Sequence, residues 1–166
     1  MTETFVPGPD TSRAFRDALG CFSTGVCVVT ALEKSGAPIG ITTNSFASVS
    51  LDPPLVLWSP AKASTRYGPF VDAEHFAIHI MAADQHDVAS GFARVPDYFA
   101  ETDWAPNEHG VPVLKGGLAH FECVRHAVHD GGDHSIVVGR VLLAAHAVGA
   151  PLLFARGQYG RFMGVK

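Results

Sequence analysis

The sequence predicts a mainly β protein, an antiparallel barrel or sandwich with a few short helices. Three observations support this fold class. Six or seven short segments have the alternating or β-branched pattern of strands. The segments between them mostly have the composition of hairpin turns, and the helical patterns are short. Because hairpins join antiparallel neighbours, this order fits a barrel or sandwich better than a doubly wound parallel sheet.

The N-terminal half predicts one helix and three strands. Residues 1–12 are expected to form a flexible N-terminal arm, and residues 13–166 a single domain. Apolar residues spaced three and four positions apart predict a helix over residues 13–21, with Ser12 as its N-cap. Strands are expected over residues 26–31, 39–43 and 55–58, and the first two form a hairpin.

The C-terminal half predicts further strands and two short helices. They are, in order, a helix that begins near Ser64 or Thr65, a strand over 76–81, a helix over 85–94 with Asp84 as its N-cap, strands over 118–128 and 135–148, and a final pair over 152–154 and 158–163. Residues 130–133, Asp-Gly-Gly-Asp, are a strong hairpin turn. Residues 95–117 are predicted to form a long surface loop with a little helix. Residues 137–143 are apolar on both strand faces, so one face would line the barrel and the other would lie under a helix or a second subunit.

Composition limits the classes of function. Only 17% of the 166 residues are charged, and such a low-charge surface on a small domain suggests apolar area covered by a partner, often a second copy of the chain. The net charge of −4 argues against partners such as nucleic acid or an anionic membrane. No apolar run approaches the roughly 18 residues of a membrane span, and the N-terminus lacks the pattern of a signal peptide. Three cysteines without a CxxC pair indicate buried thiols, no disulfide framework and a cytoplasmic location; they are Cys21, Cys27 and Cys123.

Several common chemistries lack their sequence motifs. The chain has no GxGxxG after a strand, no GxxxxGK[ST], no GxSxG and no HExxH. Nine histidines suggest a metal site, but His75 and His79 on one strand would lie about 13 Å apart. His126, His129 and His134 flank a hairpin turn without the carboxylate spacing of a metal site, so no metal is expected.

The polar segment of residues 40–59 is the main candidate site. Its hydroxyl and amide side chains lie between two predicted strands, where main-chain groups can pair with the polar edge of a flavin ring. Ser48, Ser50, Ser64 and Thr65 would donate to the ribityl chain and phosphate, and Lys62 or Arg66 would supply positive charge. From these residues alone, a polar loop that merely ends a strand is an open alternative.

Two shorter segments are further candidates. His134, at the exit of the predicted turn, would stack on a ligand ring or hydrogen-bond to it; alternatively Asp133 and His134 only complete the turn. Residues 23–26, Ser-Thr-Gly-Val, form a corner between helix and strand. They either contact a ligand or need Gly25 for the backbone geometry.

Taken together, these segments resemble the flavin reductase family, the small NAD(P)H-dependent reductases that serve two-component flavin monooxygenases. The matching segments follow the family's order over nearly the whole chain. They are Phe15-Arg16-Asp17-Ala18-Leu19-Gly20 with Thr24-Gly25-Val26, the run from Gly40 to Val56, Phe76-Ala77-Ile78-His79-Ile80-Met81, Gly132-Asp133-His134, and Pro151-Leu152-Leu153. The run from Gly40 to Val56 is long and specific. Cys27 departs from the family, in which Thr is usual at this position.

The resemblance implies an FMN-binding split β-barrel, a homodimer with flavin near its interface. It implies an NAD(P)H:flavin oxidoreductase that transfers hydride from NADH or NADPH to FMN or FAD and supplies reduced flavin to a partner monooxygenase. Since the cofactors carry this chemistry, no acid or base residue is required. The implied cofactor-binding residues are Thr43, Asn44, Ser45, Phe46, Ala47, Ser48, Ser50, Ser59, Lys62, Ser64 and Thr65, and His134 would lie near the nicotinamide.

Two related functions stay open as alternatives. A flavoprotein that holds FMN tightly, as an electron-transfer or sensing module, would keep the fold without rapid flavin turnover. An oxidase acting on a pyridoxal-type phosphate is less favoured, because the sequence shows no pronounced Arg/Lys cluster.

Overall fold

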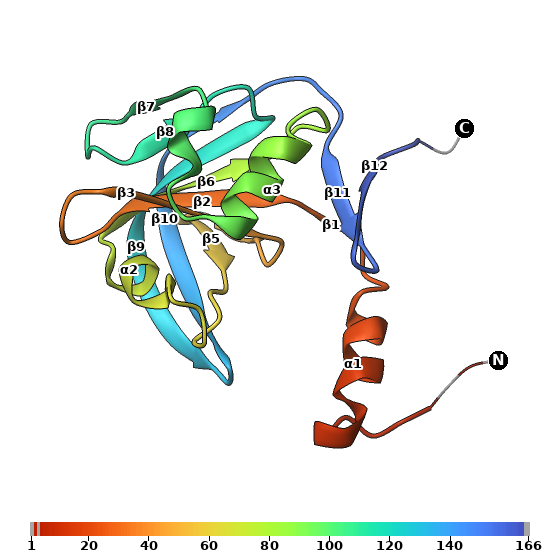
Figure 1. Cartoon of the computed structure of the whole chain (residues 1–166). Helices are drawn as coiled ribbons and strands as arrows, with labels where there is room; N and C mark the ends of the chain where they lie inside the picture. The colour runs from red at the N-terminus through yellow and green to blue at the C-terminus, as the bar shows by residue number, and fades with distance from the viewer. Residues whose placement is uncertain (1, 3, 165–166) are drawn as a thin grey trace.

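The computed structural model, which describes residue 2 and residues 4–164, is mainly β with few short helices (Figure 1). All strand pairings are antiparallel, as the sequence predicts. The helices are α1 (Ser12–Leu19), α2 (Tyr67–Asp72) and α3 (His86–Arg94), with 3-10 turns at Pro9–Thr11 and Tyr98–Glu101. The strands are β1 (Thr24–Gly25), β2 (Cys27–Leu32), β3 (Pro38–Thr43), β4 (Ala47–Leu51), β5 (Pro54–Trp58), β6 (His75–Ile80), β7 (Trp104–Pro106), β8 (Pro112–Leu114), β9 (Ala119–Gly131), β10 (His134–His146), β11 (Leu152–Ala155) and β12 (Gln158–Arg161). None of the described helices is long and apolar enough to cross a membrane.

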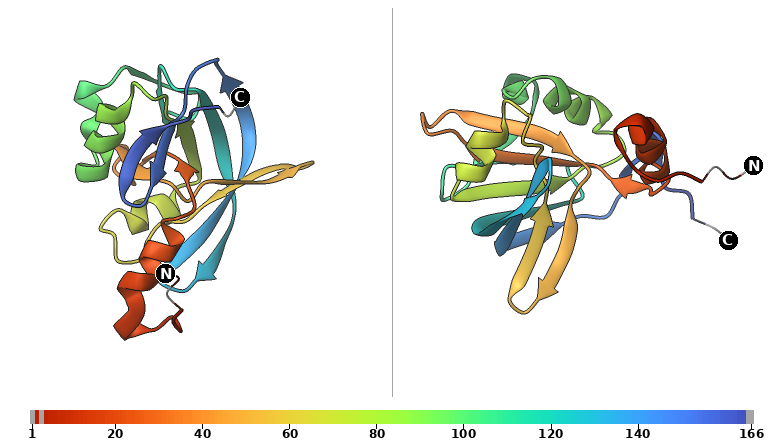
Figure 2. Two further views of the ribbon diagram at one scale, coloured as in Figure 1. Left: turned by 90° about the vertical axis from the view of Figure 1, so that its right-hand side faces the viewer. Right: turned by 90° about the horizontal axis from the view of Figure 1, so that it is seen from below.

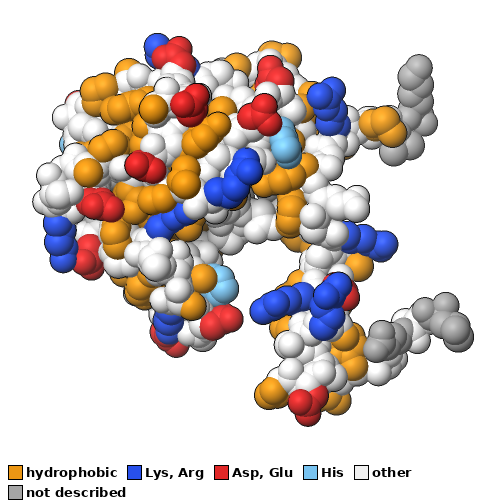
Figure 3. Space-filling model, viewed as in Figure 1, with side chains coloured by type: hydrophobic (Ala, Val, Ile, Leu, Met, Phe, Trp, Pro, Cys, Tyr) orange, Lys and Arg blue, Asp and Glu red, His pale blue; other side chains and the backbone are white. Residues whose placement is uncertain are grey.

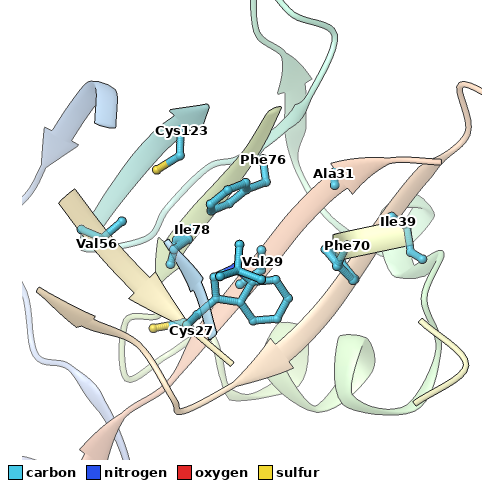
Figure 4. Packing of buried hydrophobic residues seen from close by; sticks show 11 residues of the cluster. Cys27, Val29, Ala31, Ile39, Val56, Phe70, Phe76, Ile78 and Cys123 are labelled. Carbon is cyan, nitrogen blue, oxygen red and sulfur yellow. The ribbon is translucent and has the colours of Figure 1, made fainter. Parts of the chain in front are cut away.

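The largest sheet has seven strands in the order β3-β2-β6-β9-β10-β5-β4 and is strongly curled. In a flat sheet the spacings between β3 and β5 would add up to about 24 Å. Yet Ile39 of β3 and Trp58 of β5 belong to one buried cluster, together with Phe76 of β6 (Figure 4). Within the described residues the edge strands β3 and β4 do not pair with each other, so the curled sheet is open at this seam.

A second buried cluster lies on the other face of β2. Val26 and Val28 pack with Phe92 of α3, whereas Cys27 and Val29 belong to the first cluster. Because successive strand residues point to opposite faces, β2 is buried on both sides. Helix α3 covers this second face of the sheet (Figure 1). The β-branched run that predicts this strand therefore forms the centre of both clusters.

A smaller sheet, in the order β1-β11-β12, lies beside the main sheet and connects to α1. Helix α1 stands away from the curled sheet (Figures 1 and 2). Its predicted apolar face is therefore not covered: Phe15 is 42%, Leu19 59% and Phe22 79% exposed. The amphipathic pattern correctly predicts a helix, but the partner for its apolar face does not lie within the described chain.

Most predicted strands and hairpins are confirmed, but two predicted connections are wrong, because each contains strands. The turn around Gly132 joins β9 and β10, and this glycine has the positive φ of 79° that such turns require. The polar connection after β3 contains a strand, β4, because its serines pair with β5 despite the low strand propensity of serine. The predicted loop over residues 95–117 contains the β7–β8 hairpin. Its three-residue strands, which carry Pro106 and Pro112, are too short to show a period.

The predicted helix caps are displaced by one residue. The N-cap of α1 is Thr11 rather than Ser12, and the N-cap of α3 is Gln85 rather than Asp84. The Thr11 hydroxyl accepts the N–H of Gly8 at 2.9 Å, so it stabilises the 3-10 turn within the predicted arm. Residues 1, 3 and 165–166 of the predicted arm and domain lie outside the described residues.

The cysteines follow the prediction at two of three positions. Cys27 and Cys123 are buried, and burial raises the pKa of each thiol to about 12. These thiols therefore stay protonated and act as small apolar groups. Cys21 is exposed, contrary to the prediction, because it follows a helix that stands away from the core. The three thiols are not paired in disulfides.

The buried His79 predicts a pH dependence of stability. Its Nδ1 contacts the carbonyl of Val28 at 3.0 Å and its Nε2 accepts the N–H of Leu114 at 3.0 Å. Burial lowers the pKa of His79 from 6.5 to about 4. The unfolded chain therefore takes up the proton first as pH falls, and stability present above pH 6.5 is lost towards pH 4. The free energy of unfolding should fall by about 3 kcal/mol more in wild type than in His79→Gln over this window, as measured by denaturant titration. Parallel pH profiles of the two proteins would contradict this assignment.

Gly40 predicts a steric limit in β3. A Cβ at this position would lie 2.4 Å from two ring carbons of the fully buried Phe92. Gly40→Ala should therefore lower the free energy of unfolding by about 1–3 kcal/mol. The control is Gly68→Ala on α2, where a Cβ meets nothing within 4 Å and alanine favours the helix. Equal stability of the two variants in urea would show that β3 and α3 are not closely packed here.

Candidate functional site

A hydroxyl network fixes the end of β3 against the segment that follows β5. The Oγ1 of Thr43 and the Oγ of Ser45 are 2.8 Å apart, and Ser45 Oγ accepts the main-chain N–H of Ser59 at 2.8 Å. Three residues predicted from the sequence thus form one connected group. The two hydroxyls also bond to the main chain of Ser45 and Ser59, so the network fixes the backbone that a ligand would meet here.

Asn44 lies where two cavities adjoin. Its Nδ2 donates to Thr24 Oγ1 at 3.2 Å, which holds the exposed amide beside β1. One cavity of about 180 Å³ and another of about 250 Å³ share Asn44 and Phe154 in their walls. Val26 and Tyr159 also line the smaller one. A polar amide beside an apolar and aromatic wall suits a flat ring that has polar atoms along its edge.

The other predicted residues of this segment run along β4. The Phe46 ring stacks on Phe121, with centroids 5.6 Å apart, and packs against the first core cluster, so only its main chain is available to a ligand. Ala47 and Ser48 are exposed and Ser50 is half-buried. The β4–β5 hairpin, gold in Figure 2, projects from the main sheet. The strand therefore carries Ser48 and Ser50 away from the hydroxyl network.

The segment after β5 meets the β9–β10 turn. Ala61 forms an isolated β-bridge with His134, and the Lys62 N–H donates to the carbonyl of Asp133 at 2.9 Å. His134 Nδ1 lies 2.7 Å from Asp133 Oδ1, and the His134 side chain is 44% exposed. The hydrogen bond from His134 lowers the pKa of the Asp133 carboxyl. The structure thus brings His134 beside the predicted segment 59–65.

Of the two predicted cations, Lys62 faces the solvent and Arg66 does not. Lys62 forms an exposed ion pair with Asp130, which raises the pKa of the lysine and lowers that of the carboxyl. The guanidinium of Arg66 donates to the carbonyls of Gly40, at 3.3 Å, and Phe92. Arg66 therefore connects β3 to α3, and Lys62 is the accessible cation of the two.

The predicted helix start at Ser64 or Thr65 is wrong. Helix α2 begins at Tyr67, and Ser64 Oγ accepts the N–H of Arg66 at 3.2 Å in the preceding turn. The main-chain N–H that was expected to be free for an anion is therefore occupied by the serine hydroxyl. Thr65 is exposed beside it.

Three residues near the cavities are absent from the site that the sequence predicts. Phe154 and Tyr159, with ring centroids 5.3 Å apart, belong to strands that were predicted without a role in the site. Arg156 lies in the turn between these strands, where it has φ 51° and Gly157 has φ 77°. The sequence does contain a sign of this tight turn, because Gly157 follows Arg156 between two predicted strands, and two-residue hairpin turns often end in glycine.

The histidines form no metal centre in the described chain. No group of three or more His, Cys, Asp or Glu side chains there has the arrangement of a metal site. His75 stacks on His109 with ring centroids 3.8 Å apart, and burial together with the His109 charge lowers the pKa of His75. Both rings therefore have a packing role in connecting β6 to the β7–β8 hairpin.

Comparison with known proteins identifies similar sequences. FMN reductase (NADH) SmoA of Agrobacterium fabrum is 60% identical over 158 residues, which cover 95% of this chain and 90% of that protein. The reductase component of the flavin-dependent trigonelline monooxygenase of Acinetobacter baylyi is 49% identical over 89% of this chain, but the chain spans only 48% of that relative.

Solved structures agree with the sequence comparison. The NADH:FAD oxidoreductase SgcE6 of Streptomyces globisporus has a TM-score of 0.90 and 36% identity, covering 99% of this chain and 100% of that chain. The same protein has been solved with NAD and FAD fragments. A family profile described as the flavin reductase like domain matches residues 19–163. The chain therefore belongs to the flavin reductase-like domain family.

Proposed function

We propose that this protein is an NAD(P)H-dependent flavin reductase. It transfers hydride from NADH or NADPH to FMN or FAD and supplies the reduced flavin to a separate monooxygenase. The observation that carries this proposal is the 60% identity to FMN reductase (NADH) SmoA over nearly the full length of both chains. Two relatives are named as reductase components of flavin-dependent monooxygenases, which supports a monooxygenase as the partner of this protein.

The side chains around the cavities beside Asn44 fit a flavin ring. An isoalloxazine ring needs flat apolar contacts on its faces and hydrogen-bonding groups along its edge. Phe154 and Tyr159 provide aromatic surface beside the Asn44 amide. We therefore assign the flavin ring and ribityl chain to the segment from Thr43 to Ser50, in agreement with the family resemblance. The phosphate end is assigned to Ser59, Lys62, Ser64 and Thr65. Lys62 would supply the positive charge by exchanging its exposed ion pair with Asp130 for the phosphate.

The protein's task in this reaction is to position two rings. The flavin, when bound, supplies the hydride-accepting chemistry. The chain would hold the nicotinamide at the near-attack distance of about 3 to 3.5 Å. Main-chain N–H groups near Asn44 would stabilise negative charge that develops during the transfer. His134, fixed by Asp133 and by the bridge to Ala61, is assigned to the nicotinamide side.

A steady-state assay tests this function. Purified protein is mixed with NADH or NADPH, each with FMN, with FAD or with no flavin. We expect the near-ultraviolet absorbance of the nicotinamide to decrease rapidly only when free flavin is present. The four mixtures that contain a flavin also show which nicotinamide and which flavin are preferred. No flavin-dependent oxidation of either nicotinamide would rule the function out.

We also infer a split-barrel homodimer in the cytoplasm. The curled sheet, open between β3 and β4, supports the split barrel. Uncovered apolar side chains support the dimer, since Leu142 and Leu143 of β10 are 43% and 50% exposed and the apolar face of α1 is also open. The free cysteines suit a reducing compartment. Light scattering that gives the mass of one chain at micromolar concentration would contradict the dimer.

A further inference from the structure

A basic cavity lies between α1 and the β11–β12 turn. It has a volume of about 650 Å³, and its walls include Arg13, Arg16 and Arg156. The chain carries a net charge of −4, so three arginines around one cavity are a local excess of positive charge. The sequence shows no such cluster, because β1 must pair with β11 before Arg16 and Arg156 meet.

Two of these arginines lack an acidic partner. The Nε of Arg13 lies 3.3 Å from Asp17 Oδ2. Within the described residues, neither Arg16 nor Arg156 has a carboxylate oxygen within 4 Å. Arg156 Nη2 contacts the Sγ of Cys21 at 3.7 Å, which is a weak acceptor. Unpaired guanidinium groups beside a cavity are suited to phosphate, which they bind through paired N–H donors.

The backbone of Arg156 is held in an unfavourable conformation. Its φ of 51° makes it the one residue other than glycine with a positive φ among those described. Turns of this kind favour asparagine or glycine at that position. The Arg156 N–H donates to the carbonyl of Gly20 at 2.8 Å, which ties the turn to the end of α1. Because Arg156 combines this unfavourable backbone with a place in the cavity wall, its side chain is a candidate for ligand binding.

The basic cavity adjoins the candidate flavin site. It shares Gly20 and Arg156 with the 250 Å³ cavity, which in turn reaches Asn44. The charge of Arg16 contributes to the lowered pKa of Asp133, the neighbour of His134. Figure 3 shows basic side chains of α1 facing the β9–β10 turn across an opening. A ligand that extends from His134 or Asn44 would therefore come close to these arginines.

We propose that Arg16 and Arg156 bind the pyrophosphate of the nicotinamide dinucleotide, an inference that rests on the proposed reductase function. The nicotinamide would lie beside His134, and the dinucleotide would cross the opening between the β9–β10 turn and α1. The negative charges of the pyrophosphate match the two unpaired guanidinium groups. Arg13 contributes less, because Asp17 already neutralises it.

The test uses ADP-ribose, which has the pyrophosphate but no nicotinamide. Calorimetric titration without flavin should show binding to the wild-type protein and at least tenfold weaker binding to Arg156→Asn and Arg16→Gln. Asparagine tolerates a positive φ, so Arg156→Asn keeps the turn while a short neutral amide replaces the guanidinium and its stem. The control is Arg94→Gln on α3, where the arginine Nε bonds to the Ser90 carbonyl. Unchanged ADP-ribose affinity in both variants, or no binding to wild type at millimolar concentration, would overturn the proposal.

A kinetic comparison separates this proposal from the proposed function. Both variants should raise the KM for the preferred nicotinamide at least tenfold. Arg16→Gln, which does not line the cavity beside Asn44, should leave the rate with 1-benzyl-1,4-dihydronicotinamide unchanged, because this donor has no phosphate. A rise in the flavin KM instead would assign the cavity to flavin phosphates and refute the proposal. If wild type oxidises no nicotinamide with any flavin, the reductase function fails, whereas the ADP-ribose titration still decides whether the arginines bind a pyrophosphate.

Discussion

Asn44→Ala is expected to raise the flavin dissociation constant about tenfold to a hundredfold while the fold stays intact. The Asn44 amide is exposed between two cavities, and its side chain donates a hydrogen bond to Thr24 Oγ1. Removing it would leave polar atoms at the edge of a bound ring without a partner, which costs about 1–3 kcal/mol. Quenching of flavin fluorescence in a titration measures the dissociation constant, and denaturant unfolding measures the stability.

Asn107 is the matched control, since it is the other asparagine of the chain. Its Nδ2 donates to Glu122 Oε2 at 2.7 Å, and its Oδ1 accepts the N–H groups of His109 and Val111 at 2.9 Å each. Asn107→Ala should therefore lower the free energy of unfolding by about 1–3 kcal/mol and leave the flavin affinity unchanged. If Asn44→Ala leaves flavin affinity at the wild-type value, the segment from Thr43 to Ser50 is not the flavin site.

His134→Ala should lower kcat/KM for the nicotinamide at least tenfold and change the flavin dissociation constant by less than about twofold. The imidazole is 44% exposed at the rim, and its main-chain bridge to Ala61 does not depend on the side chain. The fold of the turn should therefore survive the substitution. Steady-state kinetics with varied nicotinamide, together with a flavin titration, give the two values.

The control for this substitution is His129→Ala on the same hairpin. His129 is exposed and lies opposite Ile136 in the β9–β10 pairing, away from the bridge to Ala61. It should leave both nicotinamide use and flavin binding unchanged. An equal loss of both in His134→Ala would contradict the assignment of His134 to the nicotinamide.

Local chemistry made much of the fold predictable. The Asp-Gly-Gly-Asp turn determines the β9–β10 hairpin, because only glycine adopts the φ of Gly132 without strain. The β-branched run of β2 gives a strand that is buried on both faces. In the hydroxyl-rich run, direct hydrogen bonds join Thr43, Ser45 and Ser59 into one group, and their role in flavin binding stays a prediction.

Features that depend on distant pairing were not predictable. The cavity arginines at positions 16 and 156 meet only through the pairing of β1 with β11. Strand β4 forms because β5 supplies its partner groups, which outweigh the weak propensity of its serines. Arg66 carries a charge that suggests a phosphate ligand, but tertiary packing places two carbonyl groups around it. In each case the residue type is visible in the sequence, but the fold determines which groups the residue contacts.

Counting the flavin reduced per protein chain tests the central claim most directly. Protein at catalytic concentration is mixed anaerobically with excess NADH, or NADPH if it is preferred, and excess free FMN or FAD, and the visible absorbance of the oxidised flavin is followed. A reductase that releases its product should bleach many equivalents of flavin per chain. Bleaching of about one equivalent, with that flavin still bound after dialysis, would contradict the account and identify a tightly bound flavoprotein.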